Sequence, residues 1–401
     1  MSNVNRIMVL NPYIATLGGG EKHMGYLCQF MEEYYDYKVD IDIVVFNYDD
    51  VDVFADSFVT IEDINRQFGL ELKKTKIRKL DFKNPQNIVE VLMHRKKVED
   101  VTAEYDVFIN FMFMSKHKGK AKVNIYECMF PRPPFVPRKW WKRKAAFVER
   151  KHDNDFYNSY DCFLSNSEFT KEWAEKYWGT KVPNYVIYPP VFFEKEIKGK
   201  YQEEAKENII ISCGRFFVAS HSKKQLEMVR FFVKHQEIFK NYQYHLVGAV
   251  FDDKKDLAYL KRIKRLAATV DNVFIHENCP YEELMQLYKK AKIFWHATGY
   301  GVLEEVEPQK MEHFGITTIE AMSNGAVPVV INKGGQRETV IDGVTGFTWD
   351  TEEECVEKTR RLIEDDNLRK DMAEKSAVRA NEYSIEKFYE RNRETFRMLH
   401  I

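Results

Sequence analysis

Apolar positions follow two spacings along this chain. Short apolar runs, typical of buried strands, alternate with longer stretches in which apolar residues recur every three or four positions, as on one face of a helix. In residues 21–35, for example, Met24, Leu27, Cys28 and Met31 share one helical face. Strands are predicted at residues 6–11, 40–47, 106–111, 122–128, 162–167, 208–217, 242–248, 272–277, 292–297 and 326–332, and helices at 21–35, 168–179, 282–291 and after the capping Ser384.

The alternation of strands and helices predicts parallel β-sheets with helices on both faces. A charged stretch without clear periodicity, residues 194–208, interrupts the series and marks a domain boundary. We therefore expect an α/β protein with two Rossmann-like domains, at 1–195 and 205–384. Because ligands of open parallel sheets bind at the C-terminal ends of the strands, the cleft between two facing domains is the expected site.

Charge and cysteine content argue against several classes of protein. The 61 basic and 62 acidic residues give a net charge of −1, which does not suit a general nucleic-acid-binding protein. The six cysteines include no Cys-x-x-Cys pair, so no zinc ribbon is indicated, and scattered thiols suit the reducing cytosol. The N-terminus lacks the pattern of a signal segment, and no apolar run reaches the ~20 residues that cross a bilayer. We expect a cytoplasmic protein.

Three glycines join a predicted strand to a helix in TLGGGEKH, residues 16–23. Because they lack Cβ atoms, Gly19 and Gly20 would let a ligand approach the backbone, whose amides can face an anion. The stretch is neither a complete Gly-x-Gly-x-x-Gly nor a Walker loop. A tight turn between strand and helix explains it equally well.

Cations follow another predicted strand in CGRFFVASHSKKQ, residues 213–225. Arg215 comes directly after the strand, and Lys223 and Lys224 precede the next helix. Arginine can bind a diphosphate with a forked contact and lysine with a point charge. Solvated surface charge is the alternative for the lysines, and it is harder to sustain for Arg215.

The stretch MEHFGITTIEAMSNGAVPVV, residues 311–330, carries Glu312 and Glu320 on either side of a predicted helix start. Gly315 permits a tight turn, and the helix is expected from Ile316 to Ser323. Its free amides and the helix dipole would hold a phosphate. The two carboxylates would then meet the two ends of a phosphate-linked ligand. The alternative for Glu320 is an ordinary exposed helix residue, and the alternative for Glu312 is an acid in a surface loop.

A basic and aromatic stretch, FVPRKWWKRKAAFVERK, occupies residues 135–151. From Arg138 to Lys151 it has seven cations and one acid, a net charge of +6, with Trp140 and Trp141 among them. This composition is typical of segments that contact anionic lipids. A solvated helix with two packed tryptophans is slightly favoured, because the segment is short. The Asp-x-Asp pattern in residues 49–52 carries little weight.

Together these motifs resemble the retaining glycosyltransferases of family 4, which have the GT-B fold. The resemblance rests on GGGEK, GRFFVASHSKKQ, HATG, EHFGITTIEAMSNGAVPVV and GGQRETVIDGVTGF, and it extends to LSNSEFTKEW and VIYPPV. EHFGI is similar to the branch that includes eukaryotic mannosyltransferases of lipid-linked oligosaccharides and many bacterial glycan-assembly enzymes. The resemblance implies an acceptor-binding domain at 1–195, a nucleotide-sugar-binding domain at 205–384, and a C-terminal helix, 385–401, that crosses back to the N-terminal domain.

The resemblance also implies roles for single residues. Glu312 would face the hydroxyls of the donor sugar, Glu320 would bind the ribose, and Arg215 and Lys223 would neutralise the leaving β-phosphate. Lys223 is preferred over Lys224 because it better keeps the family's spacing to the following helix. The amides of Phe314 to Thr317 would hold the diphosphate. Donor-binding residues are therefore expected to be Gly19, Gly20, Lys224, His313, Phe314, Gly315, Ile316, Thr317 and Glu320.

The implied activity is retaining, metal-independent transfer of a hexose-type sugar from a UDP- or GDP-sugar to a glycan or lipid-linked acceptor. Neither a metal nor another cofactor is expected, because Arg215 and a lysine replace the metal. No nucleic acid is expected as a partner. Peripheral contact with the inner face of a membrane would use residues 135–151. The alternatives are a sugar-nucleotide epimerase, a glycogen-synthase-like enzyme and a non-catalytic sugar-nucleotide-binding scaffold.

One feature of the family is not found. Many members carry a histidine after the fourth strand of the N-terminal domain, close to the reacting sugar. Here that region reads DVFINFMFMSKHKGK, with Asn110 and Met112 near the expected position and His117 farther along. No catalytic histidine is therefore assigned. His313 and His296 are better placed, although a packed residue at a strand end is the simpler interpretation of His296.

Overall fold

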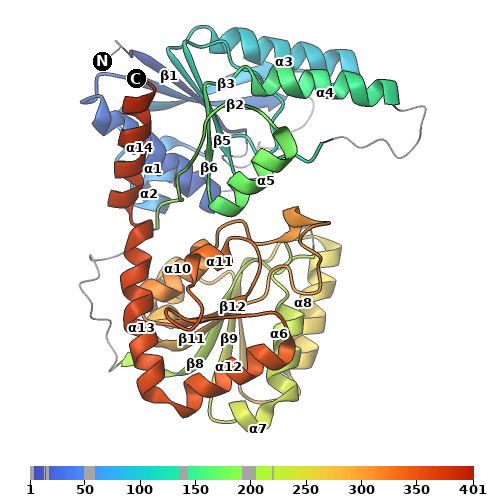
Figure 1. Cartoon of the computed structure of the whole chain (residues 1–401), viewed down its shortest axis with the longest axis vertical. Coiled ribbons are helices and arrows are strands. Elements are labelled where there is room, and N and C mark those ends of the chain that lie inside the picture. Colours follow the sequence, from blue (N-terminus) through green and yellow to red (C-terminus); the bar gives the residue numbers. More distant parts are fainter. Residues whose placement is uncertain are drawn as a thin grey trace. The chain divides into compact units, whose positions relative to one another are not determined.

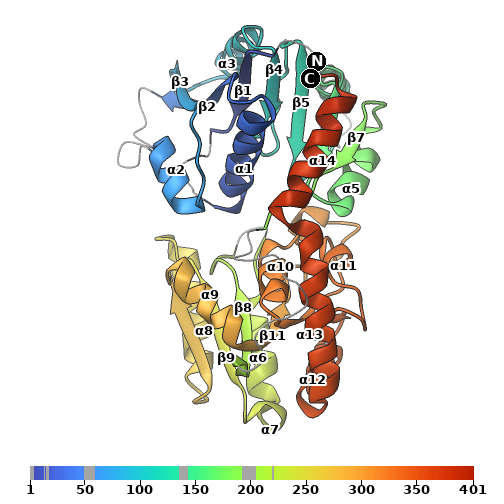
Figure 2. The same cartoon turned by 90° about the vertical axis from the view of Figure 1, so that its left-hand side faces the viewer.

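The computed structural model describes residues 4–12, 14, 18–48, 59–134, 143–191, 205–218 and 221–401, with only the backbone for 143–149. The chain forms two compact units. Unit 1 comprises Met1–Pro190 together with Ile385–Ile401, and unit 2 comprises Val191–Ser384. Their elements are labelled in Figures 1 and 2. No helix within the described ranges is long and apolar enough to cross a bilayer.

Unit 1 is built on a parallel sheet of seven described strands, in the order β3-β2-β1-β4-β5-β6-β7. The order reverses between β1 and β4, which makes that edge a topological switch point. The strands are β1 (Arg6–Leu10), β2 (Asp40–Tyr48), β3 (Thr75–Phe82), β4 (Val107–Asn110), β5 (Val123–Cys128), β6 (Cys162–Ser165) and β7 (Asn184–Val186). The helices are α1 (Gly19–Tyr34), α2 (Ile61–Phe68), α3 (Ile88–Thr102), α4 (Arg143–Tyr157), α5 (Glu168–Trp178) and α14 (Ile385–Met398).

The two faces of this sheet carry separate cores. Alternate strand residues such as Ile7 and Val9 face α1, α2 and α14, whereas Met8 and Leu10 face α3, α4 and α5. This alternation is the period of two expected of a strand. Both faces are covered, as a parallel sheet requires.

The C-terminal helix α14 belongs to the first of these cores. Phe388 and Phe396 are buried there, and the Phe396 ring lies 5.3 Å from Phe30 of α1 in an edge-on contact. Tyr389 meets the same Phe30 ring at 5.4 Å. The last helix therefore packs on the N-terminal unit, beside α1, as both views show (Figures 1 and 2).

Unit 2 repeats the plan with six described strands in the order β10-β9-β8-β11-β12-β13, all parallel. Its switch point lies between β8 and β11. The strands are β8 (Glu207–Cys213), β9 (Gln243–Gly248), β10 (Val273–Glu277), β11 (Ala291–His296), β12 (Val327–Ile331) and β13 (Phe347–Trp349). The helices are α6 (Gln225–Lys234), α7 (Gln236–Phe239), α8 (Lys254–Ala267), α9 (Tyr281–Lys290), α10 (Ile316–Ser323), α11 (Gln336–Thr339), α12 (Glu352–Glu364) and α13 (Asp366–Ala380).

Two kinds of strand prediction were wrong. The strand expected to reach residue 217 ends at Cys213, where Gln225 donates hydrogen bonds to the carbonyls of Gly214 and Arg215. Three strands were missed altogether. β3 is charged and lies at the sheet edge, and β7 and β13 have only three residues each.

Glu32 of α1 is a fully buried carboxylate that anchors the start of β3. It accepts hydrogen bonds from the backbone amides of Lys73, Lys74 and Thr75, each at 2.8 Å, and from the Thr75 hydroxyl at 2.7 Å. Four donors satisfy its charge without a cation, as a buried carboxylate requires. The helix thereby fixes the register of an edge strand whose own side chains are largely polar.

Replacing Glu32 by Ala should therefore leave three amides without acceptors, two of them partly buried and that of Thr75 buried. We expect the free energy of unfolding of unit 1 to fall by about 3 kcal/mol or more. Urea unfolding measures the loss, and amide hydrogen exchange should accelerate at residues 73–75. Glu33→Ala is the matched control, since Glu33 is exposed and should change stability by less than ~0.5 kcal/mol. Equal stability of the two variants would contradict the anchoring role.

Candidate functional site

The candidate residues of unit 2 follow the C-terminal ends of the strands at its switch point. Gly214 and Arg215 follow β8, and Ala297 to Gly299 follow β11. Glu312 lies farther along the chain, in the loop that leads to α10. This is the edge at which open parallel sheets bind ligands.

Glu312 lies at the centre of this group. Its Oε2 atom is 2.5 Å from the Lys223 ammonium and 2.9 Å from Nε2 of His296. The side chains of Glu312 and Lys223 are 17% and 19% exposed, and that of His296 is 3% exposed. The Thr298 hydroxyl lies 3.1 Å from the same His296 nitrogen. One carboxylate oxygen thus joins residues from three separate segments.

Burial and charge compete in setting the ionisation of Glu312. Burial by itself would raise the pKa of its carboxyl, but the Lys223 charge and the His296 hydrogen bond outweigh burial and hold that pKa well below its ordinary value. Burial lowers the pKa of His296, although the hydrogen bond to Glu312 opposes the shift. At neutral pH the carboxylate is therefore charged, and a neutral imidazole can donate to it through Nε2–H.

Glycines allow the backbone around these side chains to pack closely. A Cβ atom at Gly214 would lie 2.6 Å from Cγ of Lys223. Cβ atoms at Gly334 and Gly335 would lie 2.3 Å from the carbonyl oxygens of Glu312 and His313 respectively. The Gly335 amide donates to the Glu312 carbonyl at 2.8 Å. The paired glycines thus hold the loop backbone that carries the carboxylate.

The start of α10 is shaped by Gly315 and a buried glutamine. Gly315 has φ of +105°, which disfavours other residues, and a Cβ there would lie 2.4 Å from Nε2 of Gln336. Oε1 of Gln336 accepts from the Thr318 hydroxyl at 3.0 Å, while its Nε2 has no hydrogen-bond partner among the described residues. The amides of Ile316 and Thr317 belong to the first turn, where a helix has no intrahelical acceptors for them. An anion placed at this helix start would meet the amide donors of Ile316 and Thr317.

Glu320 lies one turn inside α10 and is 7% exposed. Burial and the nearby Glu320 charge raise the pKa of the Cys213 thiol to about 12. Burial, and then the charges of Cys213 and Glu320, raise the pKa of the Tyr288 hydroxyl. Glu320 therefore faces the end of β8 and helix α9, and it is not the exposed helix residue that was the alternative.

The other predicted residues of unit 2 occupy different surroundings. Arg215 is exposed, with its guanidinium 5.2 Å from the centre of the Phe217 ring, and it forms no ion pair with a described residue. Lys224 has φ of +57° and precedes α6. The His313 ring meets His221 edge-on at 4.7 Å, and burial lowers the pKa of His313 well below its ordinary value. Phe314 is buried against Tyr383, at 5.4 Å between rings.

Some predicted features lie in unit 1 or outside the described residues. Gly19 and Gly20 form the first turn of α1, where the Gly18 amide donates to Glu21 at 2.9 Å. A Cβ at Gly20 would make only ordinary contact with Met129. Residues 16 and 17 of the glycine stretch, the acidic pattern at 49–52, and 135–142 of the basic stretch lie outside the described residues.

Several residues of this site were not assigned from the sequence. His296 was set aside as a packed strand end, and it is buried, but it also hydrogen-bonds Glu312. Gln336 lies within GGQRETV, which was quoted for the resemblance without a role. Glu304 accepts from the Gly334 amide at 3.0 Å and pairs with Arg337 at 2.5 Å. The double glycine before Gln336 was the available signal for a close approach at this point.

Replacing Lys223 by Met should leave Glu312 buried without its cation. The loss of stability at pH 7 should be below the ~3–5 kcal/mol of a fully buried pair, because both side chains keep some contact with water. Burial then raises the pKa of Glu312, and protonation relieves the penalty as pH falls. The difference in Tm between parent and variant should therefore shrink from pH 7 towards pH 4.5.

In the parent protein, the contribution of Glu312 to stability changes with pH in the opposite direction. The folded pKa of Glu312 is lowered, so its stabilising contribution is complete above the unfolded pKa of about 4.3 and disappears only as pH falls through the lower folded value. Lys224→Met is the matched control and should show no such dependence. A constant difference in Tm across the pH range for Lys223→Met would contradict the assignment of charge to Glu312.

Comparison with known proteins finds similarity in the part of the chain that carries this site. Residues 193–379 match the family model of glycosyl transferases group 1. The GDP-Man:Man(3)GlcNAc(2)-PP-Dol alpha-1,2-mannosyltransferase of Dictyostelium discoideum is 27% identical over 188 residues, covering 45% of this chain and 35% of that protein. The alpha-1,3/1,6-mannosyltransferase ALG2 of Kluyveromyces lactis is 24% identical over 206 residues, covering 45% and 40%. The chain thus matches well under half of the length of these relatives.

Solved structures resemble the whole chain. A glycosyltransferase from Rickettsia africae ESF-5 superposes with a TM-score of 0.70 at 15% identity, over 99% of this chain and 98% of that one. Anabaena Alr3699/HepE in complex with UDP and glucose gives 0.64 at 16% identity, over 98% and 100%. At such identity the likeness establishes the fold. Unit 2 thus matches the group 1 glycosyl transferase model over most of its length, and the chain as a whole has the GT-B fold.

Proposed function

We propose that this protein is a retaining glycosyltransferase that needs no metal and moves a hexose from a nucleotide-diphosphate sugar to a glycan or lipid-linked acceptor. The observation that carries the proposal is the Lys223–Glu312–His296 group beside the start of α10. It places a fixed carboxylate, a cation and free helix amides at the switch point of one sheet. These are the contacts that a sugar and a diphosphate require.

Glu312 would bind the hydroxyls of the donor sugar. The hydrogen bonds from Lys223 and His296 both use Oε2, and no described residue hydrogen-bonds Oε1. That second oxygen can accept from a sugar hydroxyl without losing either protein contact. Because Glu312 remains ionised at neutral pH, it offers the stronger, charge-assisted form of this bond.

The diphosphate would lie between α10 and the end of β8. Amides at the start of α10, from Phe314 to Thr317, would contact one phosphate. Arg215, which is exposed and without an ion-pair partner among the described residues, would bind the leaving phosphate together with Lys223. An ammonium group has three donors, so Lys223 can contact Glu312 and a phosphate oxygen together. The cations thereby take the place of a divalent metal.

The remaining assigned residues would line the same donor. Glu320, buried near Cys213 and Tyr288, would bind the ribose. Lys224 and His313 lie next to Lys223 and Glu312 in the chain and would contribute to the surrounding surface. Gly19 and Gly20, at the start of α1 in unit 1, would approach the donor through their backbone.

The reaction would conserve the configuration of the sugar. The bond between the anomeric carbon and the β-phosphate oxygen breaks, and the acceptor oxygen bonds to that carbon on the same face. The acceptor proton passes to an oxygen of the leaving phosphate. The protein would mainly stabilise the charge that develops on this phosphate, through Arg215, Lys223 and the helix start.

GDP-mannose and a lipid-linked oligosaccharide are the first substrates to test. Several relatives that match about half of this chain are named as mannosyltransferases that use GDP-Man and a PP-Dol-linked acceptor. Solved structures of the same fold contain UDP, so UDP-sugars are the second choice. Contact with a membrane surface through residues 135–151 is part of the proposal, because a lipid-linked acceptor lies in the bilayer. Turnover of donor with and without acceptor separates transfer from epimerisation and from mere binding.

Thermal melting with nucleotides and their sugar conjugates, without added metal, tests the donor site. Binding to the native state should raise the Tm, with about 2.7 kcal/mol of stabilisation at a hundredfold excess over Kd. We expect the largest shift with GDP and GDP-mannose. A larger shift with UDP would change the assigned base but keep the site. No shift with any nucleotide would overturn the proposed donor site.

Glu312→Ala and Glu320→Ala should separate the two ends of the donor. Glu312→Ala should reduce transfer by at least a hundredfold, since sugar contacts act in the transition state, while nucleotide binding remains measurable. Glu320→Ala should mainly raise the Kd for the nucleotide, by about tenfold for one lost charged hydrogen bond. Titration calorimetry and a transfer assay measure both. Full activity of Glu312→Ala, or an unchanged Kd for Glu320→Ala, would contradict the respective role.

A further inference from the structure

Helix α3 of unit 1 presents an unusual row of exposed apolar side chains. Ile88, Val89, Leu92 and Met93 are 68%, 60%, 45% and 64% exposed. At 3.6 residues per turn these four positions share one face over the first two turns of the helix. Val98 and Thr102, farther along, are the buried residues of α3. The exposed row is therefore not the face that packs on the sheet.

The same face continues into cations. Lys96 and Lys97 follow the apolar row by one turn, and Lys97 also donates to the Asp81 carbonyl at 2.7 Å. Residues 83–97 carry four cations and one acid, a net charge of +3. One acid, Glu90, lies in the first turn of α3, and Asp100, farther along, pairs with Lys96 at 2.8 Å. The first two turns of α3 thus present the apolar row, and the cations Arg95, Lys96 and Lys97 follow in the middle of the helix.

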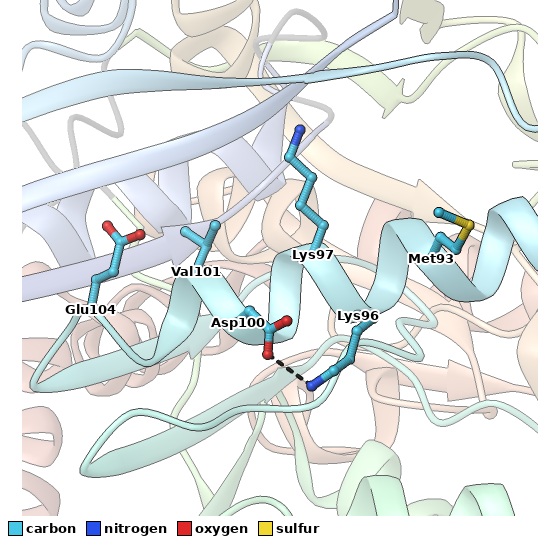
Figure 3. A pocket seen from close by; sticks show the side chains of 6 residues that line it. All are labelled: Met93, Lys96, Lys97, Asp100, Val101 and Glu104. Atoms are coloured by element: carbon cyan, nitrogen blue, oxygen red, sulfur yellow. Dashed lines mark hydrogen bonds and ion pairs between the residues drawn. The ribbon is translucent and has the colours of Figure 1, made fainter.

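Met93, the last residue of this row, lines an open hollow of about 430 Å³. Figure 3 shows the side chains around it. The Met93 side chain lies at one end and Glu104 at the other. Lys97 extends away from the helix, whereas Lys96 turns towards Asp100 (Figure 3). The residues that line the hollow are Met93, Lys96, Lys97, Asp100, Val101 and Glu104. Its walls come from α3 and the turn after it, so it is a shallow extension of the helix face.

We propose that the Ile88–Met93 face of α3 docks on the surface of an anionic phospholipid bilayer. Exposed apolar rows of this kind mark interaction sites rather than ordinary surface. A helix with apolar residues on one side and lysines beside them inserts shallowly into the headgroup region, with the long lysine chains reaching the phosphates. Anionic lipids supply the complementary charge for residues 83–97.

A protein partner fits the row less well. A standard protein interface engages about 20–30 residues on each side, whereas this face offers four apolar side chains. The segment 138–151 of the same unit adds a net charge of +6 and two tryptophans by sequence, which again favours anionic lipid over an acidic protein groove. A lipid-linked acceptor would place the protein at such a surface, and that step rests on the proposed function.

Vesicle sedimentation of the full chain tests this assignment without donor or acceptor. The probes are vesicles of phosphatidylcholine alone and of phosphatidylcholine with about 30% phosphatidylglycerol, whose headgroups give the surface a negative potential. The parent protein should bind the anionic vesicles and bind the neutral ones more weakly. Ile88→Ser combined with Met93→Ser should lower the partition coefficient at least tenfold, because two apolar side chains no longer enter the membrane.

The matched control removes apolar side chains that are equally exposed elsewhere. Leu303 and Val306 of unit 2 are each 70% exposed, and Leu303→Ser with Val306→Ser should leave vesicle binding unchanged. Unchanged nucleotide-induced melting shifts would show that both double variants are folded. Equal vesicle binding by the α3 variant and the parent, or no binding by the parent, would overturn the proposal.

A direct measurement places α3 itself at the lipid. Met93→Cys labelled with an environment-sensitive fluorophore should shift its emission to the blue on addition of anionic vesicles, while Val306→Cys should not. If the parent protein instead dimerises in solution and Met93→Ser abolishes the dimer, the face is an interface between copies of this chain and the lipid assignment fails. Loss of transfer activity alone bears on the proposed function and not on this docking face.

Discussion

The charge on Glu312 is the constraint on which the site of unit 2 depends. Its carboxylate is largely withdrawn from water, and burial alone would favour the neutral acid. Lys223 and His296 reverse that balance by contacting the same oxygen. They come from the segment after β8 and from the end of β11, two neighbouring strands. One ion pair and one hydrogen bond to the same oxygen therefore fix the relation of three segments that are far apart in the sequence.

The close backbone packing follows from the same requirement. Lys223 reaches the carboxylate only because residue 214 lacks a Cβ, and the loop that carries Glu312 lies against Gly334 and Gly335. At the other end of the loop, Gly315 adopts a positive φ and turns the chain into α10 beside Gln336. A fixed anion, a cation and a helix start are thus set in one rigid arrangement. Such preorganisation is the main way in which a protein stabilises charge that develops on a leaving group.

Much of this arrangement could be predicted from the sequence, and the failures have identifiable causes. Gly315 and the helix from Ile316 to Ser323 are as expected, because glycine and the Asn-Gly that follows Ser323 give strong local signals. The edge strand β3 was missed because TKIRKLDF is charged, and its register depends on Glu32, a residue of α1 that lies 43 positions before Thr75. His296 was undervalued for a similar reason. Nothing in the sequence states that a buried strand end faces a carboxylate from another loop.

Helix α3 shows the opposite limit of sequence patterns. The run IVEVLM in residues 88–93 has the composition of a core segment, and only the packing of Val98 and Thr102 reveals that these apolar residues face outward. Exposing four large apolar side chains costs solubility and gains nothing for the fold, because the core of that sheet face is formed by other residues. An exposed apolar surface that is unfavourable in water is tolerated when another phase covers it. The lysines at the end of the row indicate that this phase carries negative charge at its boundary, which an anionic bilayer does.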